Sequence, residues 1–266
     1  MGLTRVGRVL SFALFKMPRA VVTNPRRRRP AQLGLVFSPA PRRPGWGGAR
    51  AGAGRPRSPA NPVPHRTRPA LASRYPVHVT LRVADDLPSL RTPTLRRLLE
   101  GSFRAARAAV DGFRLAHYAI QRHHLHLLVE APDAPRLARG MQGLGARLAR
   151  RLNTALDRQG RVVVERYFAR ILRTPREVHR CLRYVLQNAR RHDAQRGRVH
   201  DAGWLDPCSS ACWFDGWRTP VAPPAGRAPP VAEPHTWLLA HGWRRHGLLD
   251  AGDTPGPLRG QARASS

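Results

Sequence analysis

The sequence is poor in acidic residues and almost free of lysine. Its 266 residues include 16 Asp or Glu against 47 Lys or Arg, and Lys16 is the only lysine. A GC-rich coding bias explains arginine in place of lysine, but it does not explain the excess of basic over acidic residues. The formal net charge of +31 favours a polyanionic partner, since guanidinium groups bind phosphate through paired hydrogen bonds. Nucleic acid is therefore favoured over a membrane surface or an acidic protein.

Long apolar runs and a paired set of cysteines are also missing. No stretch reaches the length of a transmembrane helix, and the three cysteines, an odd number, argue against a disulfide scaffold. Cys208 and Cys212, with Cys181 and His200 upstream, leave a zinc site as a weaker alternative because their spacing is poor. The apolar patch 9–15 loosely resembles a signal peptide, but no small-residue cleavage pattern follows it. We expect a cytoplasmic, nucleoid-associated protein with no membrane partner.

Charge and composition divide the chain into three regions. Residues 1–74 contain no Asp or Glu, sixteen Lys or Arg and many Pro and Gly, which predicts a disordered basic arm. Within it, Arg55 and Arg57 flank a proline as in an AT-hook core that enters the minor groove, although a generic phosphate-binding tail is the other interpretation. A folded domain is expected over 75–195. The extension 196–266 is rich in Trp, Pro and Arg, and its tryptophans either anchor it on that domain or stack on bases.

Hydrophobic periodicity predicts an α+β fold. Alternating apolar residues indicate strands, and apolar residues three and four apart indicate helices. The expected strands are 75–83, 113–120, 121–130 and 162–172, and the expected helices are 95–110, 135–158 and 175–192. The order βαββαβα predicts a ferredoxin-like antiparallel sheet with helices on one face. The opposite face of the sheet is then expected to be open.

One predicted strand carries a pair of histidines. Residues 121–130 read Gln-Arg-His-His-Leu-His-Leu-Leu-Val-Glu, and side chains alternate between the two faces of a strand. His123, Leu125, Leu127 and Val129 would face the core, whereas His124 and His126 would share the open face with Leu128 and Glu130. Two imidazoles on one face suit two ligands of one metal ion. A single such pair is, however, more often structural than catalytic.

The last predicted helix carries a candidate nucleophile. Tyr184 lies off the apolar stripe of this helix, and Asn188, four residues later, lies on the same face. Arg180 and Arg191 flank that face. A tyrosine hydroxyl can attack a phosphodiester and form a covalent intermediate, although a solvated surface tyrosine is the simpler interpretation of Tyr184 taken alone.

The histidine strand and the tyrosine helix together suggest a metal-dependent site for phosphate chemistry. A divalent ion held by His124 and His126 would polarise a scissile phosphate, and Asn188 could provide a third ligand. Imidazole ligands favour Mn²⁺, whereas cellular abundance favours Mg²⁺, so either cofactor is expected.

His124-Leu-His126 followed by Tyr184-Val-Leu-Gln-Asn188 resembles the single-tyrosine HUH transposases, and more closely the REP-associated tyrosine transposases. The resemblance covers residues 75–192 and includes the basic and aromatic segment from Arg166 to Leu172. It implies that the histidines and Asn188 bind the metal. It also implies that Tyr184 attacks single-stranded or hairpin DNA, leaving a 5′-phosphotyrosine link and a free 3′ hydroxyl. Where the family usually has Asn-Pro, this chain has Asn188-Ala189, which is expected to lengthen the helix.

The sequence therefore predicts a transposase or single-strand DNA endonuclease that cleaves and rejoins DNA. Arg166, Arg170, Arg180 and Arg191 of the domain, with Arg55 and Arg57 of the arm, are the expected DNA-binding residues. A second copy of the chain is considered as a further partner. Two alternatives stay open: a DNA- or RNA-binding protein that keeps the fold without catalysis, and a metal hydrolase that uses the histidine strand without tyrosine chemistry.

Overall fold

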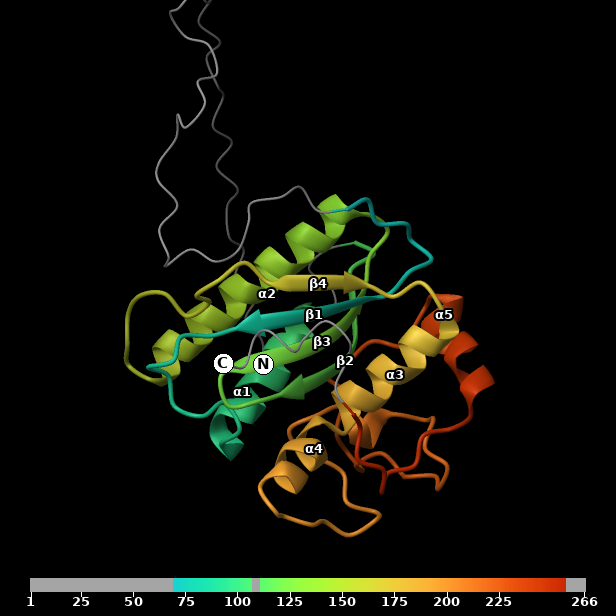
Figure 1. Ribbon diagram of the computed structural model, residues 1–266. Coiled ribbons are helices and arrows are strands. Elements are labelled where there is room, and N and C mark those ends of the chain that lie inside the picture. The colour runs from blue at the N-terminus through green and yellow to red at the C-terminus, as the bar shows by residue number, and fades with distance from the viewer. Residues whose placement is uncertain (1–68, 107–110, 257–266) are drawn as a thin grey trace, which may run out of the picture. The chain divides into compact units, whose positions relative to one another are not determined.

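The computed structural model describes residues 69–106 and 111–256, and these residues form an α+β structure (Figure 1). The strands are β1 (Val77–Arg82), β2 (Arg114–Ile120), β3 (His124–Glu130) and β4 (Phe168–Ile171). The helices are α1 (Pro93–Ala106), α2 (Ala134–Ala155), α3 (Pro175–Leu186), α4 (Asn188–Gln195) and α5 (Trp237–Ala240), with 3-10 turns η1 (Ala211–Trp213) and η2 (Gly242–His246). The predicted order of elements is present, with the predicted last helix divided into α3 and α4.

The four strands form one antiparallel sheet in the order β2-β3-β1-β4. β1 lies in the middle and pairs with β3 on one side and β4 on the other. In the β1–β3 register, Thr80 is opposite His126 and Arg82 is opposite His124. Since side chains of directly opposed residues share a face of the sheet, the register determines which β1 side chains surround the two histidines.

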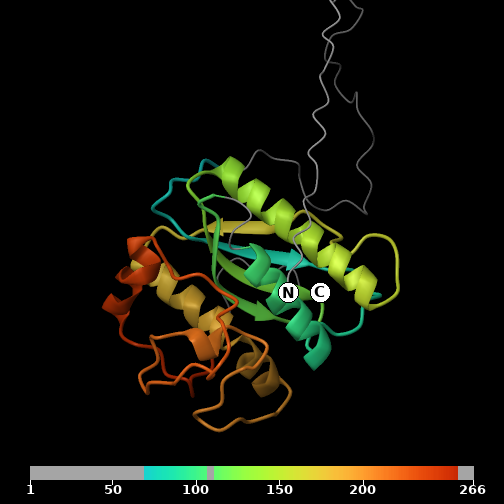
Figure 2. The same cartoon turned by 180° about the vertical axis from the view of Figure 1, so that it is seen from behind.

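One face of the sheet is covered by α1 and α2. The view from behind shows both helices in front of the strands (Figure 2). Leu125, Leu127 and Val129 of β3 point to this face and pack into the larger hydrophobic core with the apolar stripes of the two helices. These residues confirm the predicted core face of β3.

The opposite face is not open, contrary to the sequence-based expectation. Leu128 of β3 packs there with Leu182 and Val185 of α3 and with Trp217 and Trp243 of the C-terminal extension. The expectation was wrong because a third helix and the extension supply the apolar surface that this face requires. The second face of the sheet is therefore buried together with the histidines on it.

Helix α3 begins at a capping box and ends earlier than predicted. The Thr174 side chain accepts from the Glu177 backbone N–H, the Glu177 side chain accepts from the Thr174 backbone, and Pro175 occupies the first turn. At Gln187 the backbone leaves the helical region, with φ −113° and ψ 15°, and the Gln187 side chain donates to the Asp250 carbonyl. The prediction of one continuous helix to His192 is therefore wrong. The contact at the interruption involves Asp250, which is too far along the chain for a local sequence pattern to reveal it.

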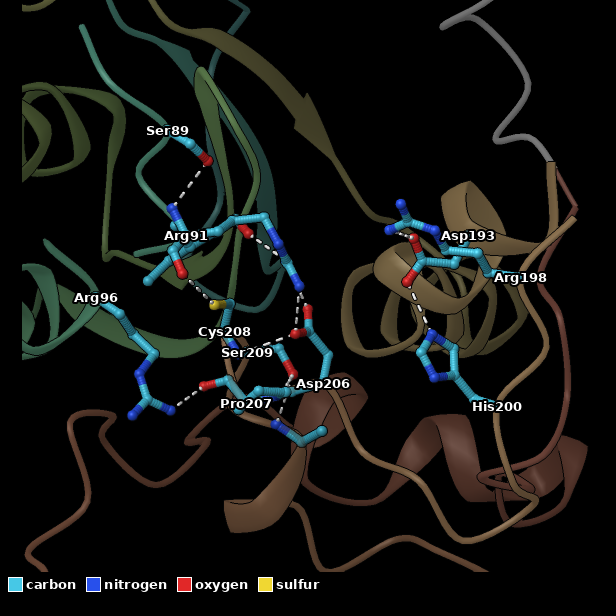
Figure 3. A network of polar contacts seen from close by, with 12 residues as sticks. Ser89, Arg91, Arg96, Asp193, Arg198, His200, Asp206, Pro207, Cys208 and Ser209 are labelled. Carbon is cyan, nitrogen blue, oxygen red and sulfur yellow. Dashed lines mark hydrogen bonds and ion pairs between the residues drawn. The ribbon is translucent and has the colours of Figure 1, made fainter. Parts of the chain in front are cut away.

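The C-terminal extension is attached to the domain by buried polar contacts. Arg91 donates to both carboxylate oxygens of Asp206, at 2.8 and 3.0 Å (Figure 3). Ser210 bonds the backbone of Tyr118 in β2. Trp243 is 1% exposed, whereas Trp237 is 50% exposed. The anchoring interpretation is thus confirmed for Trp243, and the packed chain begins at least four residues before Tyr75, since Leu71 lies in the core.

Several other sequence expectations can be compared with the described residues. All three cysteines are free thiols. In the part of the chain that the structure describes, no helix has the length and apolar character needed to span a bilayer. The predicted basic arm falls on residues 1–74, of which 1–68 lie outside the described residues.

Glu130 offers a test of the attachment between sheet and extension. It is 3% exposed and accepts three hydrogen bonds of 2.8 Å, from the His235 backbone and from the backbone and hydroxyl of Thr236. Glu130→Gln replaces one acceptor by a donor and leaves a buried N–H without a partner. We expect it to lower the free energy of unfolding by ~2 kcal/mol and the melting temperature by about 6 °C.

Thermal unfolding followed by circular dichroism would measure this change. The matched control is Glu165→Gln, because Glu165 is exposed. An equal melting temperature for Glu130→Gln and the wild type would show that the carboxylate does not hold the extension.

Candidate active site

His124 and His126 lie next to each other on β3, on the face that α3 covers. Their ring centroids are 4.9 Å apart and nearly perpendicular, at 85°. His126 is 2% exposed, whereas His124, at the start of the strand, is half-buried. The structure therefore places one imidazole deep in the site and the other towards its accessible edge.

Tyr184 of α3 faces the ring of His126. Its hydroxyl lies 3.5 Å from Nε2 of His126, and the two ring centroids are 5.1 Å apart. The tyrosine is 5% exposed. The phenol of Tyr184 and the imidazole of His126, 58 residues apart in the sequence, thus meet within one chain.

Asn188 completes this group from the first turn of α4. It is fully buried, and neither polar atom of its carboxamide makes a hydrogen bond of ordinary geometry with a described residue. The carboxamide is nevertheless close enough to the Tyr184 hydroxyl to lower the pKa of that group. Burying an amide without an aligned hydrogen-bond partner costs free energy. A ligand that bonds to the Asn188 carboxamide would recover part of that cost.

The site also includes two β1 side chains that sequence analysis missed. His78 Nε2 and Thr80 Oγ1 each lie 3.3 Å from Nδ1 of His126. His78 is 1% exposed and stacks on His126, with centroids 5.3 Å apart and an interplanar angle of 27°. Because the alternation of β1 places its odd-numbered valines in the core, the sequence could have predicted that His78 and Thr80 lie on the opposite face. The sequence could not have predicted that β1 pairs with β3.

Burial keeps the three imidazoles neutral at physiological pH. The pKa of His78 falls from 6.5 to about 4 through burial and the nearby charge of Arg170. The pKa of His124 also falls to about 4, through burial and then the charges of His192 and Arg82. The pKa of His126 lies well below its ordinary value for the same first reason. Neutral imidazoles carry the free lone pairs that a metal ion requires.

Burial makes Tyr184 harder to ionise. Burial raises the pKa of Tyr184 above its ordinary value of 10, whereas the Asn188 carboxamide and the Arg191 guanidinium oppose the rise. The guanidinium carbon of Arg191 lies 5.9 Å from the centre of the Tyr184 ring. Forming a phenolate here therefore requires positive charge beyond what Arg191 supplies.

The other predicted DNA-binding arginines lie in different surroundings. Arg170 forms an ion pair with Glu177 at 3.2 Å, which partly neutralises its charge. Arg166 and Arg180 are exposed. Arg55 and Arg57 lie outside the described residues. Of the predicted set, only Arg191 has a described contact with Tyr184.

The donor set fits a divalent ion only if an amide oxygen joins the two histidines. Within residues 69–106 and 111–256, no group of three or more His, Cys, Asp or Glu could hold a metal ion. Asn188 is outside those four residue types; its buried oxygen has no aligned partner, and its carboxamide acts on the Tyr184 hydroxyl, which in turn lies 3.5 Å from His126. Two nitrogens and one oxygen are a ligand set that Mn²⁺ accepts and that Mg²⁺ accepts less readily.

Comparison with known proteins found similarity to a solved structure. No protein-family model matches the sequence, and no curated protein matches it. The solved structure of a REP-associated tyrosine transposase bound to a REP hairpin is similar, with 13% sequence identity and a TM-score of 0.43. The match covers 56% of this chain and 82% of that one. This likeness does not establish a family.

The buried imidazoles predict how stability depends on pH. His78 and His117 are nearly fully buried, and both have a pKa lowered from 6.5 to about 4. Below pH 6.5 the unfolded chain takes up protons that the folded chain does not. Stability is therefore fully present above that value and falls between pH 6.5 and about 4, by ~1.4 kcal/mol per pH unit for each such group.

Urea unfolding between pH 7.5 and 4.5 would measure this dependence. His117 contacts Ser210 and Phe214 of the extension, so His117→Phe removes one titrating group while keeping a ring in its place. The variant should have a shallower slope, by ~1.4 kcal/mol per pH unit. A wild-type free energy of unfolding that stays constant over this range would contradict the assigned pKa shifts.

Proposed function

We propose that this protein is a metal-dependent, single-strand DNA endonuclease and strand transferase of the tyrosine transposase type. The observation that supports this most directly is the 3.5 Å approach of the Tyr184 hydroxyl to Nε2 of His126. The candidate nucleophile thereby lies against one candidate metal ligand, and the Asn188 carboxamide acts on the same hydroxyl. The ferredoxin-like order of strands and the excess of arginine agree with the proposal.

His124, His126 and Asn188 would hold Mg²⁺ or Mn²⁺. Their nitrogens and oxygen are unprotonated or uncharged, so a cation would meet no opposing positive charge from its own ligands. When bound, the ion would supply positive charge at the scissile phosphate and stabilise the departing 3′ oxygen. All three ligands and Tyr184 come from one chain, so the proposed site is complete without a second copy.

Tyr184 would act as the nucleophile. Its hydroxyl loses a proton, its oxygen bonds to phosphorus, and the bond from phosphorus to the 3′ oxygen breaks. That oxygen takes up a proton, which yields a free 3′ hydroxyl and a 5′-phosphotyrosine. Rejoining is the reverse reaction with the same or another 3′ hydroxyl. Arg191 would assist by stabilising both the phenolate and the incoming phosphate.

The accessible edge of the site favours a strand of nucleic acid as substrate. Arg82 and His192 lie close enough to half-buried His124 to lower its pKa, and Arg191 lies beside Tyr184. These groups supply positive charge or hydrogen-bond donors where a phosphate backbone would approach. A single strand or a hairpin flank fits this narrow approach better than a duplex, because Tyr184 is 5% exposed.

The proposal is tested by covalent trapping of labelled DNA. Wild-type protein with Mn²⁺ and single-stranded hairpin DNA should form an adduct that survives denaturing electrophoresis. The label should stay with the protein when it is 3′ of the cleavage point and should be released when it is 5′ of it. Tyr184→Phe should form no adduct, since it lacks the oxygen that bonds to phosphorus, and His126→Ala should lower adduct formation by at least about 100-fold.

Tyr75→Phe is the matched control, because this half-buried tyrosine precedes β1 and contacts Arg74 instead. It should form the adduct at the wild-type rate. Binding of DNA without any adduct, with every metal tried, would replace the proposal by a nucleic-acid-binding function. Cleavage that persists in Tyr184→Phe would replace it by metal-dependent hydrolysis.

A further inference from the structure

Two side chains of β1 contact the ring nitrogen of His126 that faces away from Tyr184. His78 Nε2 lies 3.3 Å from Nδ1 of His126, and Thr80 Oγ1 lies at the same distance from that atom. We propose that His78 and Thr80 are positioning residues that keep the proton of His126 on Nδ1 and so leave Nε2 free as a ligand. This inference rests on the proposed function, because it assigns Nε2 to the metal.

The two ring nitrogens of a neutral imidazole differ in their hydrogen-bonding roles. One of them carries a hydrogen and donates, while the other has a lone pair and accepts. Only a nitrogen with a free lone pair can bind a metal ion. In this site Nε2 points at the Tyr184 hydroxyl, 3.5 Å away, and Nδ1 points at β1. Metal binding beside the nucleophile therefore requires the tautomer with its hydrogen on Nδ1.

His78 and Thr80 can both accept that hydrogen. A neutral His78 has one accepting ring nitrogen, and a threonine hydroxyl has two lone pairs. Water does not readily replace His78 as the acceptor, since His78 is 1% exposed and His126 is 2% exposed, whereas Thr80 is half-buried. Loss of these acceptors would leave the Nδ1 hydrogen unsatisfied in a buried place, and the other tautomer would become favourable.

Stacking adds an orientational constraint. The rings of His78 and His126 lie nearly parallel, at 27°, with centroids 5.3 Å apart, while Tyr184 meets both rings edge-on. A half-turn of the His126 ring would put carbon atoms where Nδ1 and Nε2 now lie, and would lose the contacts of Nδ1 with His78 and Thr80. His78 therefore contributes an acceptor atom and limits the orientation of the ring that it contacts.

The β1–β3 register explains why His78 and Thr80 contact His126 and why their neighbours in β1 do not. Thr80 is directly opposite His126, and His78 is two residues further along the same face. Val79 lies between them on the opposite face, in the hydrophobic core. The positioning contacts are thus a direct consequence of strand pairing.

Binding of Mn²⁺ alone, measured by calorimetry on the full chain without DNA, tests the inference. His78→Phe keeps a stacked ring and removes the acceptor, and it should weaken Mn²⁺ binding by about 10-fold. Thr80→Val should have a smaller effect, and the double variant should approach about 100-fold. His78→Gln places an amide near the lost Nε2 position and should restore most of the affinity.

The tautomer of His126 is a second readout, independent of metal. Nitrogen-15 NMR of the imidazole should show the hydrogen on Nδ1 in the wild type and a shift towards the Nε2 form in His78→Phe and in the double variant. His117→Phe is the matched control, because His117 is a buried histidine of β2 that contacts the extension. It should leave both the Mn²⁺ affinity and the His126 tautomer unchanged.

Each outcome decides the matter. Wild-type Mn²⁺ affinity in His78→Phe and in the double variant, with or without a lower melting temperature, would overturn the inference and reduce His78 to a packing residue. No Mn²⁺ binding by the wild type would overturn both the inference and the metal site. If the wild type binds Mn²⁺ in a way that depends on His78 but forms no covalent DNA adduct, the inference about His78 holds. Only the phosphotyrosine function is then contradicted.

Discussion

The antiparallel pairing of β1 with β3 is the constraint on which the rest of the site depends. It sets Thr80 opposite His126 and Arg82 opposite His124, so one face of two neighbouring strands becomes polar while the other stays apolar. Shifting the register by one residue would place Val79 opposite His126 and would turn the polar face into the core. The large apolar core under α1 and α2 prevents that shift and so holds the candidate site in place.

Burial gives the site its chemical character. A sheet face with His78, His124 and His126 would be hydrated and weakly basic if it were open. Helix α3 and the C-terminal extension cover it with Leu182, Val185 and Trp243, and the pKa values of the histidines fall as a result. The same burial raises the pKa of Tyr184. The environment therefore favours metal binding and at the same time creates the need for a cation beside the tyrosine.

The extension contributes to the site without supplying a candidate catalytic group. Its Asp250 carbonyl accepts from Gln187, at the point where α3 ends and α4 begins. Asn188 is the first residue after this break. Glu130, at the end of β3, holds the backbone of His235 and Thr236 in turn. The strand that carries the histidines and the helix that carries the tyrosine are thus both tied to the same C-terminal segment.

Local sequence determined the α+β class, the order of the elements, the two faces of β3 and the capped start of α3. These follow from periodicities of two and about 3.6 residues and from the Thr174–Glu177 capping pattern, which need no knowledge of distant residues. It also singled out His124, His126, Tyr184 and Asn188, although their roles remain proposals. Only the tertiary structure decided that the second sheet face is buried, that the tyrosine helix breaks at Gln187, and that His78 and Thr80 contact His126. Each of these depends on strand register or on packing between segments far apart in the chain, and such contacts leave no local pattern in the sequence.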